Sequence, residues 1–219
     1  MTIRTILCDA DDTLWYDARY FRKLENYFLE ICEGVGVTRY EALKELNRVL
    51  MSESGAGEAR FKNAIIRCCK KINSGGLQDL QYECRKFDNH RIELLAGVRE
   101  VLTSIQLEKY MVTKGNKAEQ LVKVEKSGLG ELFKNIFVMN SKKREEYIDI
   151  ILKCDLDPAK IIIIGNSVKH DITPVIELGG MAIWLNHDEN SYGNNAKLPK
   201  SAFVAENWLE VQDIVGALT

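Results

Sequence analysis

Five short apolar runs constrain the fold of this chain more than any other feature of its sequence. Each run is four to six residues long, which suits a buried strand and is too short for a typical helix. The last four are separated by stretches long enough for helices, so the pattern predicts strand–helix–strand units and a parallel sheet. The runs are residues 3–8, 110–113, 136–139, 161–164 and 181–185.

Residues 15–92 have a different pattern. They contain no proline, and their apolar residues recur at the spacing of amphipathic helices in four groups separated by glycines. We therefore predict four helices packed as a small bundle. The simplest architecture is α/β: a parallel-sheet core of residues 1–14 and 93–219, with an all-α domain of residues 15–92 inserted after the first strand.

Composition excludes several classes of protein. Hydrophobic residues make up 46% of the chain and charged residues 28%, so a folded core is expected rather than disorder. The net charge of -2 argues against a basic nucleic-acid surface, so we expect no nucleic-acid partner. The six cysteines form no CxxC pair, which argues against a zinc site or a disulfide framework.

The sequence also predicts a cytoplasmic protein that does not enter a membrane. No apolar run approaches the roughly 18 residues that span a bilayer. Residues 1–8 are too short, and too interrupted by Arg4, for a signal peptide.

Carboxylates follow two of the predicted strands. Asp9 and Asp11 come directly after the first run, where one could act as nucleophile and metal ligand and the other as general acid and base. The alternative is an acidic turn that caps the next helix. After the run 161–164, Asn166 offers an oxygen ligand and Asp171 a carboxylate, a pair that suits a hard cation such as Mg²⁺.

Groups that could bind phosphate follow the other two strands. Thr113 and Lys114 lead into a glycine turn that exposes backbone N–H groups, although an ordinary strand-to-helix turn reads the same way. Lys142 opens a basic segment in which one ammonium could neutralise a phosphoryl oxygen. The alternative for that segment is a solvated basic helix start.

The order of these groups carries more information than any one of them. Acid, hydroxyl, lysine, then oxygen ligand plus acid resembles the four motifs of the haloacid dehalogenase-like hydrolase superfamily, across essentially the whole chain. The resemblance implies a Rossmann-like core. It also implies that residues 15–92 are the helical cap domain of that family.

The resemblance assigns a role to each motif residue. Asp9 would be the nucleophile, Asp11 the general acid and base, Thr113 the phosphate-binding hydroxyl, and Lys142, in preference to Lys143, the phosphate-stabilising cation. Mg²⁺ would be bound by Asp9, the backbone carbonyl of Asp11 and Asn166, with Asp171 either as a further ligand or beside the ligands. The sequence departs from the usual pattern at Asn166, where the family commonly has aspartate, and at Asp12, where glycine is more usual.

Within the superfamily, dehalogenases lack a carboxylate at the position of Asp11. The resemblance therefore implies a magnesium-dependent phosphatase that acts on a small phosphorylated metabolite through an aspartyl-phosphate, as a monomer or homodimer. A phosphosugar mutase and a non-catalytic phospho-ligand binding protein are the alternatives. In the loop Gly55–Arg60, Arg60 could meet an anionic substrate, although a plain interhelical turn is the simpler interpretation.

Overall fold

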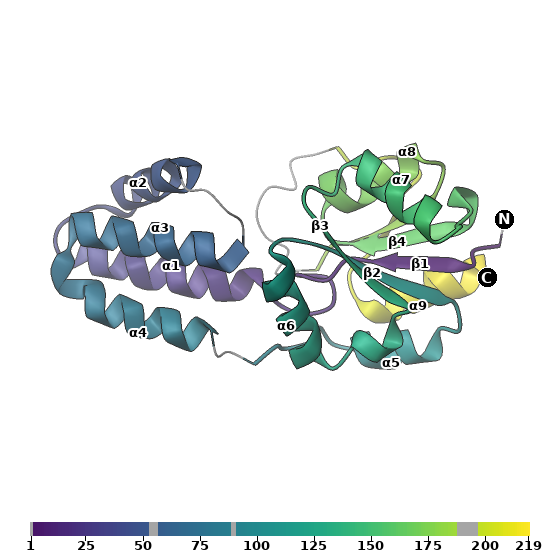
Figure 1. Cartoon of the computed structure of the whole chain (residues 1–219), viewed down its shortest axis with the longest axis horizontal. Helices are drawn as coiled ribbons and strands as arrows, with labels where there is room; N and C mark the ends of the chain where they lie inside the picture. The colour runs from purple at the N-terminus through teal and green to yellow at the C-terminus, as the bar shows by residue number, and fades with distance from the viewer. Residues whose placement is uncertain (1, 53–56, 89–90, 188–196) are drawn as a thin grey trace. The chain divides into compact units, whose positions relative to one another are not determined.

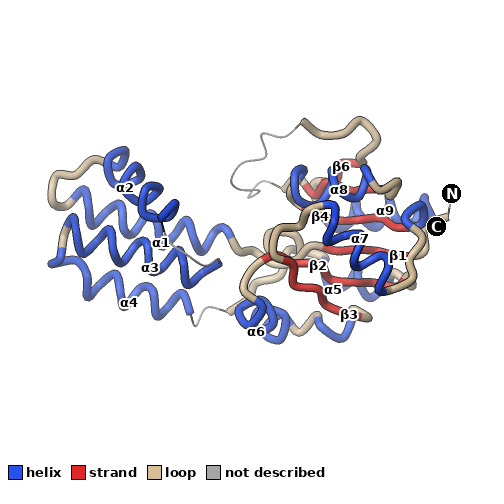
Figure 2. Tube along the Cα trace, turned by 45° about the horizontal axis from the view of Figure 1, so that its top comes forward, coloured by secondary structure: helices blue, strands red, loops and turns tan. Residues whose placement is uncertain are grey.

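The computed structural model describes residues 2–52, 57–88, 91–187 and 197–219. Within these residues, strands form one parallel sheet in the order β3-β2-β1-β4-β5-β6. Figure 2 shows them in red, side by side. The strands are β1 (Thr5–Cys8), β2 (Glu108–Lys114), β3 (Asn135–Met139), β4 (Ile161–Gly165), β5 (Met181–Leu185) and β6 (Phe203–Ala205).

The sheet is covered on both faces, as Figure 1 shows, with α7 and α8 on one side and α5 and α9 on the other. Alternate residues of the strands supply the two cores. In β4, Ile162 and Ile164 pack on one face with Val98 of α5 and Trp208 of α9. Ile161 and Ile163 pack on the opposite face with α7 and α8. The helices of this part of the chain are α5 (Val98–Ser104), α6 (Lys117–Ser127), α7 (Arg144–Lys153), α8 (Thr173–Glu177) and α9 (Trp208–Leu218).

Short helical turns complete the core. A π-helix at Val168–Ile172 follows β4 and leads directly into α8. Two 3₁₀ turns lie at Gly130–Leu132 and Pro158–Lys160, each just before a strand. The architecture confirms the predicted α/β class with a Rossmann-like parallel sheet. The sequence pattern did not predict β6, because its three residues carry too little periodicity to distinguish a strand from a loop.

A second unit, Arg19–Arg91, is made of helices around a core of its own. Leu24, Phe28, Leu46, Ile65 and Leu80 are buried together there. Cys32, Cys68 and Cys69 join the same core as small apolar residues. The helices are α1 (Ala18–Glu33), α2 (Arg39–Ser52), α3 (Gly57–Ile72) and α4 (Leu77–Asp88), with a 3₁₀ turn at Ser74–Gly76.

The division between the two units falls after Ala18 and before Ile92. The sequence pattern placed residues 15–18 with the helices, whereas in the structure Trp15 is fully buried in the sheet core. The reason is that the chain forms a tight turn after β1, so its first helical residue comes later than the apolar pattern suggests. None of the helices in the described ranges is long and apolar enough to cross a membrane.

Candidate active site

Four neighbouring parallel strands, β3, β2, β1 and β4, end at a common edge of the sheet. Cys8, the last residue of β1, is in register with Met111 of β2 and with Ile164 of β4. The backbone N–H of Asp9 then donates to the carbonyl of Ile164 at 2.9 Å, which extends the ladder by one residue. The groups that follow these strands are therefore held close together, at the edge where ligands bind in open parallel sheets.

Lys142 lies at the centre of this edge. Its side chain is buried, and its ammonium donates to Asp9 Oδ1 and, at 2.7 Å, to Asp171 Oδ1. Burial alone would lower the pKa of Lys142, but the charges of Asp171 and Asp9 outweigh it and hold the pKa above its ordinary value. Lys143 is instead exposed, as the residue that precedes α7. Of the two lysines, Lys142 is thus the one beside the carboxylates.

Asp9 is nearly fully buried, and its neighbours Asp171 and Lys142 shift its pKa in opposite directions. Burial and the neighbouring charge of Asp171 raise its pKa to about 7, while the ammonium of Lys142 acts in the other direction. Its Oδ2 accepts a hydrogen bond of 3.1 Å from the hydroxyl of Thr13, a fully buried residue. Thr13 fixes the carboxylate from the side opposite Lys142.

Asp171 is completely buried and is held at both oxygens. One oxygen accepts from Lys142, and Oδ2 accepts from the backbone N–H of Ser167 at 2.9 Å. It packs across Gly165, where a Cβ would lie 2.5 Å from the Cβ of Asp171. Tyr147 holds the same turn from α7, since its hydroxyl donates to the carbonyl of His170 at 3.0 Å.

The oxygen atoms at this edge fit a hard divalent cation. Two buried carboxylates, those of Asp9 and Asp171, approach one ammonium, and burial together with the charge of Asp171 raises the pKa of Asp9. A cation would offset that charge. Within the described ranges no three His, Cys, Asp or Glu side chains cluster closely enough to hold a metal. The remaining ligands would be neutral oxygens, such as the backbone carbonyl of Asp11, the amide of Asn166 and water.

Asn166 follows β4 directly and is half-buried. Its backbone carbonyl accepts a hydrogen bond of 2.9 Å from the indole N–H of Trp184, on the neighbouring strand β5. This bond fixes the backbone at the residue where the sequence predicts a metal ligand.

Asp11 is oriented by a different set of residues. Its Oδ1 accepts from the indole of Trp15 at 2.8 Å and from Lys123 at 3.2 Å, and its Oδ2 accepts from the amide of Gln120 at 2.8 Å. Gln120 also accepts a hydrogen bond of 3.0 Å from the hydroxyl of Thr113, so it links Thr113 to Asp11. Thr113 is buried at the end of β2.

Gln120 and Lys123 were not predicted as site residues. They lie three positions apart on α6, and both are buried despite their polar side chains. A glutamine and a lysine at this spacing also occur on ordinary solvated helix faces, so the sequence carries no distinctive signal for them.

One residue of the acidic turn, Asp12, caps the next helix, as the alternative interpretation of this turn predicts. The carboxylate of Asp12 accepts from the backbone N–H groups of Asp17 and Ala18, at 2.9 and 3.0 Å, and so caps the start of α1. Asp12 also has a φ of 56°, a left-handed conformation that favours glycine. This backbone requirement explains why glycine would be the common residue at this position.

Lys114 and Arg60 were also predicted to bind substrate. Lys114 is exposed at the end of β2. Arg60 was expected in a loop but lies within helix α3, and its guanidinium donates to the backbone carbonyl of Leu50 in α2. A substrate would have to compete with that bond. Gly55 and Ala56, the start of the expected loop, fall outside the described residues.

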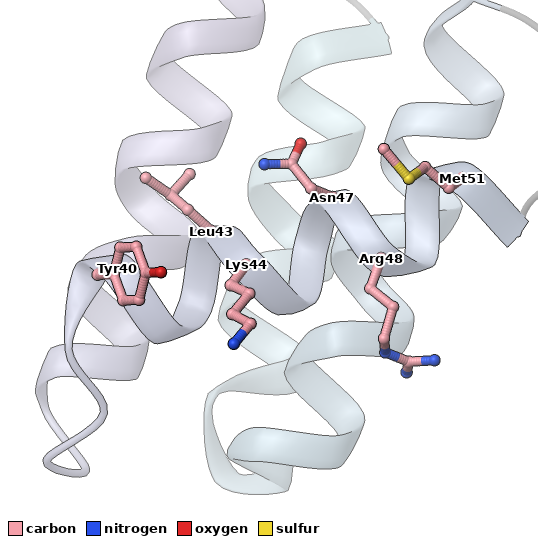
Figure 3. A pocket seen from close by; sticks show the side chains of 6 residues that line it. All are labelled: Tyr40, Leu43, Lys44, Asn47, Arg48 and Met51. Atoms are coloured by element: carbon pink, nitrogen blue, oxygen red, sulfur yellow. The ribbon is translucent and has the colours of Figure 1, made fainter.

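A hollow on the outer face of α2 offers no alternative hydrolytic site. Figure 3 shows that one helix supplies the side chains around it. None of its lining residues is an aspartate, glutamate, histidine, serine or cysteine that could act as a nucleophile or a base. The lining residues are Tyr40, Leu43, Lys44, Asn47, Arg48 and Met51.

The sequence matches no protein-family model and no curated protein. Among solved structures, the chain is similar to a haloacid dehalogenase-like family hydrolase from Xanthomonas campestris, with 27% identity and a TM-score of 0.84 over 99% of this chain and 96% of that one. It is also similar to the magnesium-bound HAD-hydrolase YfnB from Bacillus subtilis, with 20% identity and a TM-score of 0.67 over 98% and 99% of the two chains.

A third similar structure is an L-2-haloacid dehalogenase from Xanthobacter autotrophicus, with 13% identity and a TM-score of 0.66 over 99% of this chain and 100% of that one. Other matches include a predicted phosphoglycolate phosphatase and further dehalogenases. The fold and the similarity to the Xanthomonas campestris hydrolase define a hydrolase of the α/β class with an inserted helical domain. The chain belongs to the haloacid dehalogenase-like hydrolase superfamily.

Proposed function

We propose that the protein is a magnesium-dependent phosphatase that hydrolyses a small phosphorylated metabolite through an aspartyl-phosphate. A cytoplasmic monomer or homodimer that binds neither nucleic acid nor membrane is part of the same proposal. The observation that carries it is Asp11. This second carboxylate lies two residues after Asp9 and contacts three side-chain donors, and dehalogenases of the superfamily lack it.

In the first step an oxygen of Asp9 attacks phosphorus, and the bond from phosphorus to the leaving oxygen breaks. Lys142 would hold an oxygen of the phosphoryl group, because its ammonium already lies against Asp9. Thr113 and the backbone N–H groups after β2 would bind the other oxygens. Protonated Asp11 gives its proton to the departing alcohol, so that the alcohol leaves neutral.

In the second step water attacks the phosphorus of the aspartyl-phosphate. Asp11, now ionised, takes a proton from that water, and the bond between phosphorus and Asp9 breaks. Inorganic phosphate and the Asp9 carboxylate are formed, and Asp11 is protonated again. One carboxyl group thus serves both half-reactions, as acid and then as base.

Mg²⁺ bound at the oxygens of Asp9, Asp11, Asn166 and Asp171 would supply positive charge for the phosphoryl group and would favour the ionised form of Asp9. The raised pKa of Asp9 supports this role, because the buried carboxylate needs a further positive charge to remain ionised at neutral pH.

The test is hydrolysis of a panel of phosphorylated metabolites and an aryl phosphate, with Mg²⁺ and with a chelator. We expect phosphate release that requires Mg²⁺ and stops when chelator is added. Full activity in chelator would refute the metal assignment.

The same purified protein should be incubated with 2-haloacids, because dehalogenases share its fold. Halide release without phosphate release would identify a dehalogenase. Tight binding of a phosphorylated metabolite with neither activity would identify a non-catalytic binding protein.

A further inference from the structure

Lys123 is a buried lysine outside the family motifs described above. Its side chain is 6% exposed, and its ammonium donates to Asp17 Oδ1 at 2.6 Å and to Asp11 Oδ1 at 3.2 Å. Burial of an ammonium costs several kcal/mol unless carboxylates compensate it. Helix α6 therefore carries a lysine whose burial depends on two aspartates of the turn that follows β1.

The two aspartates differ in their surroundings. Asp17 is the more buried, and burial together with the charge of Asp11 raises its pKa to about 8, while Lys123 opposes that effect. The side chain of Asp11 is 24% exposed, and Gln120 links it to Thr113 in β2. Asp17 therefore anchors Lys123, and Lys123 presents its ammonium to Asp11.

Lys123 is also the charged donor among the three that hold Asp11. Trp15 and Gln120 are neutral and fix the direction of the carboxylate, whereas Lys123 adds a positive charge at Oδ1. The same ammonium also contacts Asp17, so it links the two carboxyl groups. All of these residues belong to the sheet unit.

We propose that Lys123, anchored by Asp17, is a positioning residue that holds Asp11 for its two proton transfers. This inference rests on the proposed phosphatase function. Lys123 acts through its hydrogen bond to Asp11. Its loss would weaken the contribution of Asp11, which is largest when the leaving group is a poor one.

The readout is the dependence of kcat/KM on the leaving group, because kcat/KM reports the steps up to the departure of the alcohol. An alkyl phosphate needs the proton of Asp11, whereas dinitrophenyl phosphate releases a stable phenolate and needs little help. For Lys123→Met we expect kcat/KM to fall about 30-fold or more on the alkyl phosphate, within the 10²–10⁴ range of general acid catalysis, and less than about threefold on dinitrophenyl phosphate.

The second half-reaction provides an independent signal. Hydrolysis of the aspartyl-phosphate also depends on Asp11, so Lys123→Met should show a burst of dinitrophenolate followed by a slow steady rate. Lys123→Arg should recover much of the lost activity on the alkyl phosphate, since it keeps a charged donor. In an Asp11→Asn background, Lys123→Met should change the leaving-group dependence no further.

Two variants guard against a trivial loss of folding. Lys123→Met together with Asp17→Asn removes both charges of the buried pair, so it leaves no unpaired carboxylate on Asp17 and should fold stably. It should show the same leaving-group dependence as the single variant. Lys126→Met, which changes an exposed lysine three positions further along α6, is the control and should match the wild type on both substrates.

The outcomes separate this inference from the proposed function. Equal losses on both phosphates in the folded double variant would overturn the positioning role and leave the phosphatase intact. A wild-type protein that hydrolyses neither phosphate would refute the phosphatase and the positioning role together.

Discussion

Lys142 Nζ lies 2.7 Å from Asp171 Oδ1, and the same ammonium contacts Asp9 at the end of β1. The three side chains come from segments that follow three different strands, β1, β3 and β4. Because Asp171 is completely buried and Lys142 nearly so, their ion pair holds the loop after β3 against the helical turn after β4. The site is therefore also a structural element of the core.

Substitution of Lys142 should destabilise the fold. Lys142→Met leaves Asp9 and Asp171 as buried carboxylates without their cation, and breaking a buried pair in this way costs about 3–5 kcal/mol. Urea unfolding at pH 7 measures the loss. Lys143→Met changes the adjacent exposed lysine and should stay within about 0.5 kcal/mol of the wild type. Equal effects of the two substitutions would contradict the contacts described for Lys142.

Asp9→Asn should abolish turnover while the fold is retained. An amide oxygen is a poor nucleophile, so phosphate release should fall below about one-thousandth of the wild-type rate. Acid quenching of the wild type during turnover, followed by peptide mapping, should place the phosphoryl group on Asp9. Mapping of the phosphoryl group to another residue would remove Asp9 from the nucleophile role.

Asn166→Asp should lower the Mg²⁺ concentration for half-maximal activity. A carboxylate attracts a divalent cation more strongly than a neutral amide, and a tenfold change corresponds to about 1.4 kcal/mol of binding free energy. Asn135→Asp adds the same charge at the opposite end of a strand, where Asn135 is exposed, and serves as the control. An unchanged requirement in Asn166→Asp would show that Asn166 is not a ligand.

Gly165→Ala should destabilise the protein by about 1–3 kcal/mol, because overpacking shifts neighbouring groups. A Cβ at this position would lie 2.5 Å from the Cβ and 2.6 Å from the Cγ of Asp171, and neither atom can move without displacing the loop. Gly216→Ala is the matched control. It lies in α9, where the added Cβ would have no atom within 4 Å apart from the adjacent residues and backbone of its own helix, and should be neutral or stabilising by up to about 1 kcal/mol. Thermal unfolding of both variants tests the comparison.

The local pattern of the sequence was sufficient for the strands and for the groups that follow them. Buried strands such as β4 are continuous apolar runs, and parallel strands end at one edge, so the sequence alone predicts that Asp9, Thr113 and Asp171 lie close to that edge. Arg60 shows where this reasoning failed, because nearby glycines indicated a loop although the residue lies in α3.

Tertiary structure alone decided the partners of the charged side chains. The resemblance favoured Lys142 over its neighbour Lys143, but the sequence does not show what either lysine contacts. In the folded chain, Lys142 has a φ of 52° and is buried against Asp9, 133 positions away, whereas Lys143 is exposed. Lys123 looks like a surface residue of α6 until the helix packs against Asp11, 112 positions earlier. Periodicity and turn residues report on neighbours along the chain, whereas the burial and pairing of a charge depend on segments that only the folded sheet brings together.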